Sequence, residues 1–112
     1  MLAKINRLKK RKDFELVFKK GKGFKEDFLV LKRIKNNLKQ SRFGFIVGKK
    51  ISKKATLRNK IKRRLRGLVR IKLGKIKKGF DIILIAKEGL ENKDFWEIEE
   101  IINKLFNKAK II

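Results

Sequence analysis

The densest group of chemically active side chains in this sequence is a basic stretch at residues 49–66, KKISKKATLRNKIKRRLR. It contains ten lysines or arginines and no acidic residue. Lysine-rich helices are usually just solvated, but such helices commonly carry interleaved acids that form pairs three or four residues apart. Without acids the cations repel one another unless a polyanion neutralises them. The stretch therefore indicates binding to phosphates, which gives salt-dependent affinity with little sequence preference.

Other chemistries find few suitable residues in this chain. It has no histidine and no cysteine, which excludes imidazole acid–base catalysis, thiolate chemistry and the usual zinc ligands. It also lacks a glycine-rich phosphate loop of the GxGxxG type. Most acids lie near the C-terminal end, where the dipole of a helix explains them better than a two-metal nuclease site does. We therefore expect no catalytic residue and no metal ligand.

The charge of the chain is large and unevenly distributed. The formal net charge is +24, and residues 1–80 hold 30 cations and 4 acids, whereas residues 81–112 hold 5 cations and 7 acids. We expect the basic part to face a polyanionic partner and the C-terminal part to face away. No apolar run approaches the roughly 20 residues of a membrane span, and the N-terminus lacks the apolar core of a signal peptide. We expect a cytoplasmic protein with no membrane partner and no small-molecule substrate.

An amphipathic helix must position the basic stretch. From residue 56 to about residue 73 the apolar side chains form one arc of a helical wheel, and cations occupy much of the opposite side. Arg58 and Arg64 flank the arc, where an arginine can lay its stem on the core and point its guanidinium along a groove. Asn59 can both donate and accept, which suits a directional contact to RNA or hydrated metal, although a solvated helix asparagine is equally ordinary.

The N-terminal part combines a basic segment with two aromatic residues. Residues 1–12 are polar and basic without a sustained apolar period, which predicts a mobile arm that orders on RNA. Residues 13–20 begin with acids and end with lysines, as a helix dipole favours. Phe14 and Phe18 are four residues apart and share one face of this helix. They are either core residues or a stacking surface for the bases of a single strand.

The remaining pattern indicates a sheet and a final helix. Strands are predicted at residues 27–35, 41–48 and 80–86, with a flexible basic turn around Gly21 and Gly23. A helix follows Asn92 or Asp94, either of which can cap it. The predicted order is α-β-β-β-α-β-α, or the same with one strand fewer. We therefore expect residues 1–112 to form a single α+β RNA-binding domain, with an about four-stranded sheet and helices packed on it.

The basic stretch resembles the signature of the bacterial ribonuclease P protein subunit. The central helix of that family carries an Arg-Asn-Arg element, then Lys-Arg and a further Arg, and these fall on Arg58, Asn59, Lys60, Lys62, Arg63 and Arg66. Residues 7–22 are similar to the first helix of the same family, including its two phenylalanines. Further agreement lies in FLVL (28–31), GFIVGKK (44–50), GFDIILIA (79–86) and DFW (94–96). The resemblance covers nearly the whole chain in the right order.

This resemblance implies a fold detail and a function. The fold would contain a left-handed βαβ crossover, as in one domain of a small-subunit ribosomal protein, although about 98% of such connections are right-handed. The RNA subunit would hold the catalytic centre and cleave precursor tRNA with Mg²⁺. The protein would bind ribonuclease P RNA and the single-stranded 5′ leader, as a monomer in a 1:1 ribonucleoprotein. The alternative is a structural RNA-binding protein, such as a ribosomal protein.

The resemblance also implies two sets of site residues. The leader cleft would be lined by Arg11, Phe14, Phe18, Leu29 and Leu31. RNA would bind the central helix and the turn before it through Lys49, Lys50, Lys53, Lys54, Arg58, Asn59, Lys60, Lys62, Arg63 and Arg66. Any metal contact of Asn59 would be indirect. Two residues depart from the family pattern: Lys60 stands where a second arginine is common, and Leu31 where some members have tyrosine.

Overall fold

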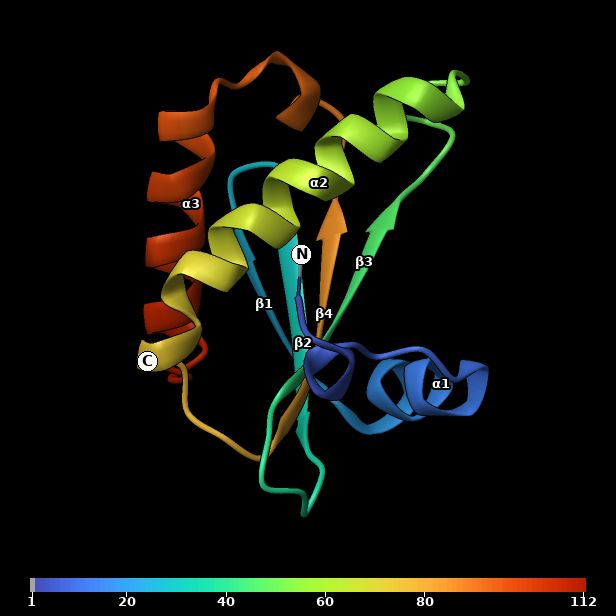
Figure 1. Ribbon diagram of the computed structural model, residues 1–112. Helices are drawn as coiled ribbons and strands as arrows, with labels where there is room; N and C mark the ends of the chain where they lie inside the picture. Colours follow the sequence, from blue (N-terminus) through green and yellow to red (C-terminus); the bar gives the residue numbers. More distant parts are fainter. Residues whose placement is uncertain (1) are drawn as a thin grey trace.

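The strands of this chain form one mixed sheet with helices on both faces (Figure 1). The computed structural model describes residues 2–112. In chain order the elements are η1 (Lys4–Asn6), α1 (Arg11–Lys20), β1 (Lys22–Glu26), β2 (Leu29–Lys35), β3 (Arg42–Val47), α2 (Ala55–Lys72), η2 (Leu73–Lys75), β4 (Phe80–Ala86), η3 (Leu90–Asn92) and α3 (Phe95–Lys108). This confirms the predicted order α-β-β-β-α-β-α.

The sheet has the strand order β1-β2-β4-β3. β1 and β2 are antiparallel, β2 and β4 are antiparallel, and β3 and β4 are parallel. The parallel pair is connected through α2. In Figure 1, α2 crosses in front of the sheet, β3 and β4 both point upward, and β4 lies to the left of β3. The crossover is therefore left-handed, as the resemblance implies.

The two faces of the sheet bury different side chains, because successive residues of a strand point to opposite faces. One face packs against α2 and α3 and forms the main core, which includes Leu29, Leu31, Ile82 and Leu84. The other face, which we call the α1 face, carries a smaller cluster around Leu8, Val17 and Ile83. Within residues 2–112, none of the helices has both the length and the apolar character that crossing a membrane requires.

The N-terminal segment differs from the predicted mobile arm. Leu2 is only 2% exposed and belongs to the main core, while Leu8 is 5% exposed and packs on the α1 face. The side-chain amide of Asn6 donates to the Ser41 carbonyl at 3.0 Å, and the Leu8 N–H donates to the Phe43 carbonyl at 2.9 Å. The two leucines lie on opposite faces, so their burial produces no helical or strand period in the sequence. Met1 lies outside the described residues.

A further difference concerns the segment predicted as a flexible turn around Gly21 and Gly23. This segment forms β1, in which Gly23 pairs with Lys32 and Phe24 pairs with Leu31 of β2. Glycine weakens a strand but does not prevent pairing at a sheet edge. The third strand of the predicted order is therefore present, at the position where the glycines had suggested a turn.

The N-terminus of α3 confirms one of the two predicted caps. The Asp94 carboxylate accepts from the Glu97 N–H at 2.8 Å, and the Glu97 carboxylate accepts from the Asp94 N–H at 3.1 Å. This reciprocal capping box satisfies two N–H groups that the helix itself leaves without partners. The N-terminus of α3 lies at the end of the molecule away from α1 (Figure 1).

Candidate nucleic-acid interface

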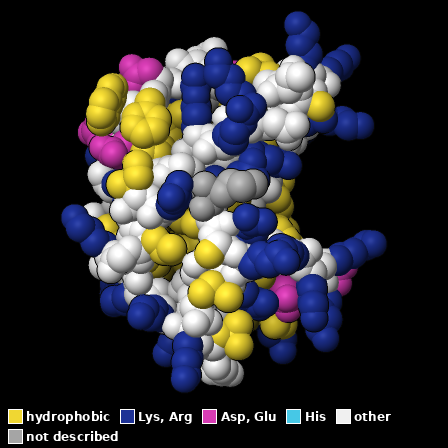
Figure 2. Space-filling view, in the orientation of Figure 1, with side chains coloured by type: hydrophobic (Ala, Val, Ile, Leu, Met, Phe, Trp, Pro, Cys, Tyr) yellow, Lys and Arg dark blue, Asp and Glu magenta, His cyan; other side chains and the backbone are white. Residues whose placement is uncertain are grey.

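The two sides of α2 separate core from cations, as its sequence predicted. Ile61, Leu65, Leu68 and Val69 are buried against the sheet and α3. The exposed side carries Asn59, Lys60, Arg63 and Arg70, and the half-buried flanks carry Arg58, Lys62, Arg64 and Arg66. Figure 2 shows basic side chains gathered along this helix. The helix therefore presents a continuous positive surface that its own apolar arc holds in place.

The cations of residues 49–66 have no carboxylate partner among the described residues 2–112; the ion pairs there involve other side chains. Lys49, Lys50, Lys53 and Lys54 are exposed in the turn before α2. One guanidinium of this region has an internal partner, because Arg58 donates to the Ser52 carbonyl at 2.8 Å. That bond fixes the turn against the first turn of α2. The other cations are available to phosphates.

Phe14 is half-buried on the α1 face, and Gly44 of β3 allows it to lie there. A Cβ at position 44 would come within 2.4 Å of the Phe14 ring, so a side chain at this position would displace the ring. Phe14 also lines a small pocket together with Lys62 and Arg66 of α2. The structure therefore brings Phe14 of α1 close to Lys62 and Arg66 of α2 at the edge of β3, although the two helices pack on opposite faces of the sheet.

Phe18 has a different environment. It is 40% exposed and belongs to neither core cluster. The Lys32 ammonium lies 5.5 Å from its ring centroid and donates to the Phe18 carbonyl at 3.4 Å. Arg11, also predicted in the cleft, is highly exposed at the start of α1 and bonds Glu15 at 3.1 Å. Phe18 with Lys32 thus offers an aromatic and cationic surface, whereas Arg11 points into solvent.

The prediction that Leu29 and Leu31 line the cleft is wrong. Both side chains are 0% exposed in the main core, on the face opposite α1. The alternation of β2 directs Val30 and Lys32 to the α1 face instead. A shift of one residue in a strand moves a side chain to the other face, and that shift is the source of the error.

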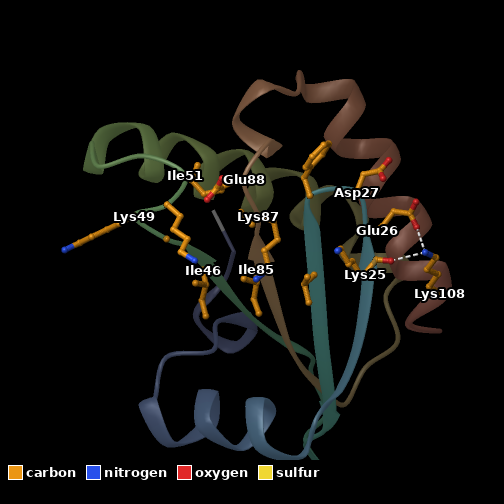
Figure 3. A pocket seen from close by; sticks show the side chains of 15 residues that line it. Lys25, Glu26, Asp27, Ile46, Lys49, Ile51, Ile85, Lys87, Glu88 and Lys108 are labelled. Carbon is orange, nitrogen blue, oxygen red and sulfur yellow. Dashed lines mark hydrogen bonds and ion pairs between the residues drawn. The ribbon is translucent and has the colours of Figure 1, made fainter.

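A larger pocket on the same side of the sheet was not predicted. It has a volume of about 970 Å³ and we call it the distal pocket (Figure 3). Val30, Ile85 and Ile46 form its apolar floor, in one row across β2, β4 and β3, because Val30 pairs with Ile85 and Ile85 with Ile46. Its polar lining consists of Lys25, Lys49, Lys50, Lys87 and Lys108 with Glu26, Asp27 and Glu88. A sequence pattern that could have predicted this pocket is the apolar residue in each of these strands whose side chain points away from the main core.

A partly buried ion-pair network holds α1 against the sheet. The Arg42 guanidinium donates to both carboxylate oxygens of Asp81, at 2.8 and 2.7 Å, and lies 3.5 Å from the carboxylate of Asp13 in α1. The hydrogen bond to Asp81 raises the pKa of Arg42 above its ordinary value, although burial opposes the charge. Asn36 also donates to Asp81, at 2.8 Å. This network fixes the start of α1 and so the place of Phe14.

Comparisons with known proteins agree with this geometry. The family model described as Ribonuclease P matches residues 2–110. The "Ribonuclease P protein component" of Thermotoga maritima is 44% identical over 110 residues, covering 95% of this chain and 91% of the relative. That of Fusobacterium nucleatum is 38% identical, covering 96% and 100%. The solved Staphylococcus aureus RNase P protein has a TM-score of 0.88 at 31% identity, with coverage of 95% and 96%. Sequence, fold and the basic α2 surface beside an aromatic α1 together show that this chain belongs to the ribonuclease P protein family.

Proposed function

We propose that this protein is the protein subunit of ribonuclease P, the endoribonuclease that removes the 5′ leader from precursor tRNA. Two observations together carry the proposal. The family model matches residues 2–110, and the cations of residues 49–66, on α2 and the turn before it, have no carboxylate partner among the described residues. Within the ribonucleoprotein the RNA subunit performs the cleavage, and this chain binds and positions RNA.

The two surfaces of the molecule suit two RNA partners. The exposed side of α2 and the turn before it present point charges suited to the phosphates of the folded ribonuclease P RNA. The α1 face offers the half-exposed ring of Phe18, the ammonium of Lys32 and the distal pocket. Aromatic rings within a cationic groove are typical of single-strand binding, because every base has a face that stacks. We assign the leader to this face.

The Mg²⁺ of the reaction belongs to the RNA in this proposal. Within residues 2–112, no group of three or more acidic, histidine or cysteine side chains lies together in a way that could hold a metal ion. Asn59 is exposed on the cationic side of α2, where its amide can bond RNA or water of a hydrated ion. We propose that the RNA subunit holds the Mg²⁺ and that one copy of this chain binds each RNA subunit.

Reconstitution tests the proposal. The protein is combined with a bacterial ribonuclease P RNA at low Mg²⁺, and cleavage of precursor tRNA is measured with long and short leaders. We expect the protein to increase cleavage, and more so for the long leader. No increase at any protein concentration would contradict the proposal. Co-purification with ribosomal particles in place of ribonuclease P RNA would favour the alternative of a structural RNA-binding protein.

A further inference from the structure

A small pocket lies at the outer edge of β3, between α1, α2 and the N-terminal segment. Its volume is about 210 Å³, and we call it the edge pocket. It is lined by Leu2, Arg7, Leu8, Lys9, Phe14, Phe43, Gly44, Phe45, Lys62 and Arg66. The pocket is far smaller than the distal pocket and holds no acidic side chain, so its chemistry is different.

Aromatic rings form the walls of the edge pocket. Phe43 and Phe45 stack on each other with ring centroids 6.5 Å apart. Phe43 is buried, whereas Phe45 is half-buried and packs on the margin of the main core. The Phe14 ring lies over Gly44 and so closes the pocket from the side of α1. An incoming flat, aromatic group would therefore meet ring faces from two elements.

The backbone of β3 adds a donor and an acceptor. β3 is the last strand of the sheet, and the Phe43 carbonyl accepts the Leu8 N–H at 2.9 Å, so the polar groups of Phe43 point away from β4. In a strand, the N–H and C=O groups of every second residue point to the same edge. The N–H and C=O of Phe45 therefore point to the same outer edge as those of Phe43. The N-terminal segment meets this edge at the bridge of Arg7 to Phe43. Such outward groups on an edge strand are available for pairing.

Cations surround the opening. Arg7, Lys9, Lys62 and Arg66 line the pocket from the N-terminal segment and from α2. Arg7 donates to the Leu2 carbonyl at 2.7 Å, which holds the N-terminal segment in place. Lys62 and Arg66 are one helical turn apart on the flank of α2 and face the same opening. Two such side chains can bind the phosphates on either side of one nucleotide.

We propose that the edge pocket binds one unstacked RNA nucleotide. Its base lies against Phe45 and Phe14 and bonds the backbone edge of Phe45, while Lys62 and Arg66 hold its phosphates. This inference rests on the proposed function, because it concerns how the same protein holds RNA. Two RNAs have the required chemistry, the ribonuclease P RNA and the precursor tRNA, and the experiment separates them.

A tryptophan placed in the pocket reports on the base. The only tryptophan of the chain is Trp96, which is 71% exposed on α3 and does not line the pocket. The variant Trp96→Phe with Phe45→Trp has one tryptophan, in the edge pocket, and it is titrated separately with ribonuclease P RNA and with precursor tRNA. We expect one of the two RNAs to quench the fluorescence with a 1:1 end point, because a base stacks on the indole. The RNA that quenches is the source of the bound nucleotide. Binding of both RNAs without quenching would overturn the inference.

A second pair of variants does not depend on the new indole. Phe45→Leu removes the ring and keeps an apolar side chain, and Phe24→Leu makes the same change in a half-buried phenylalanine of β1 that packs on the same core. We expect Phe45→Leu to weaken binding of the source RNA by about 5-fold to 150-fold, the range for one stacked base, with Phe24→Leu close to wild type. Equal effects of the two variants would overturn the inference. If the wild-type protein binds neither RNA, the proposed function itself fails.

Discussion

Single residues on the α1 face have separable roles. Phe14 is half-buried over Gly44, so its ring contributes to the docking of α1 as well as to any RNA contact. Phe18 lies outside both core clusters and has an ammonium, that of Lys32, 5.5 Å from its ring. The sequence left open whether the two rings are core or stacking surface. The structure gives Phe14 a packing role in addition to its place in the edge pocket, and it leaves Phe18 free to stack.

This difference leads to a prediction for Phe18→Ala. We expect the variant to keep the stability of the wild type, since little apolar contact is lost, and to weaken binding of long-leader precursor tRNA by about 5-fold to 150-fold per stacked base. Binding of tRNA without a leader is expected to stay unchanged. Phe14→Ala is the comparison, and it is expected to lower thermal stability as well. Equal losses for leader and leaderless RNA with Phe18→Ala would show that the ring does not contact the leader.

At the scale of single residues, the sequence does not predict which face of β2 is buried. The sequence predicts the strand β2, but Leu29 and Leu31, which are predicted to line the cleft, lie in the core. Both faces of β2 carry apolar residues, so the sequence has no strict alternation to show which set is inside. Leu31 pairs with Leu84, and both lie in the main core, which shows that this face of β2 is the buried one. Val30 and Lys32 are the corresponding residues of the α1 face.

At the scale of elements, two glycines have different roles, one where α1 packs on β3 and one inside α2. Gly44 lies in β3 directly under Phe14, whereas Gly67 lies inside α2, where an added methyl group would have open space around it. The first glycine is needed for close approach between elements. The second is a weak point of the helix, since glycine inside a helix destabilises it relative to alanine.

The two glycines therefore predict opposite effects of the same substitution. Gly44→Ala is expected to lower the free energy of unfolding by about 1–3 kcal/mol, as overpacking does, and to weaken leader binding because Phe14 shifts. Gly67→Ala is expected to raise the free energy of unfolding by about 0.5–1 kcal/mol. Denaturant unfolding of both variants measures the two values. A stable Gly44→Ala protein with normal leader binding would show that the Phe14 position does not matter.

A polar clasp joins α3 to β1 beside the distal pocket. The Lys108 ammonium forms an ion pair with Glu26 and donates to the Lys25 carbonyl at 2.9 Å. The hydrogen bond from Lys108 lowers the pKa of Glu26 below its ordinary value. A carboxyl with a lowered pKa in the folded state stabilises the fold above its unfolded pKa, and this contribution is lost as the pH falls through the folded pKa.

The clasp predicts a pH-dependent effect of Glu26→Gln. At neutral pH the variant is expected to unfold at a lower temperature than the wild type, and the difference is expected to vanish in acid, once Glu26 is protonated. Glu100→Gln is the matched control, since the Glu100–Lys104 pair is exposed within one helix and contributes little. Thermal unfolding at a series of pH values measures both. A constant difference between Glu26→Gln and wild type at all pH values would exclude the ion pair as its cause.

Most elements followed from local pattern, and the exceptions have physical causes. The helices α2 and α3 were predicted because their apolar residues recur at helical spacing, and α3 also has its capping residue, Asp94. The sequence of β1 predicts a turn, because it contains Gly23 and only one large apolar residue. The sequence of the N-terminal segment predicts a mobile arm, because Leu2 and Leu8, which are buried on different faces, form no apolar period. Both segments are held in place by contacts with residues far away in the sequence, and such contacts leave no pattern in the local sequence.

At the scale of the whole molecule, the charge is unevenly distributed: the excess of cations lies in one part of the chain and most of the acids lie in another. The net charge of +24 comes from the region before residue 81, and the acidic residues lie mainly on and before α3. In Figure 2 one group of acidic side chains lies at the upper left beside exposed hydrophobic ones, a second group lies at the lower right, and basic side chains cover much of the remaining surface. Charge of this size opposes folding by self-repulsion, and an RNA partner relieves it. We expect this division to orient the protein on RNA.

This division predicts which lysines contribute to the salt dependence of RNA binding. Lys60→Gln, on the exposed side of α2, is expected to lower the affinity for ribonuclease P RNA and to reduce the slope of log affinity against log salt by about one. Lys104→Gln removes the same charge from α3, where Lys104 pairs with Glu100, and is expected to leave the slope unchanged. Equal slopes for the two variants would mean that binding depends on total charge and not on the α2 surface.

The measurement that tests the central claim most directly is crosslinking from the leader within the reconstituted ribonucleoprotein. Precursor tRNA with a photoreactive uridine at successive leader positions is bound to the protein and ribonuclease P RNA, and the crosslinked peptides are identified by mass spectrometry. We predict crosslinks to α1 around Phe18, to β2 around Lys32 and to the lining of the distal pocket. Crosslinks confined to α3 around Trp96, or none in a complex that still binds the catalytic RNA, would contradict the claim that the α1 face holds the leader.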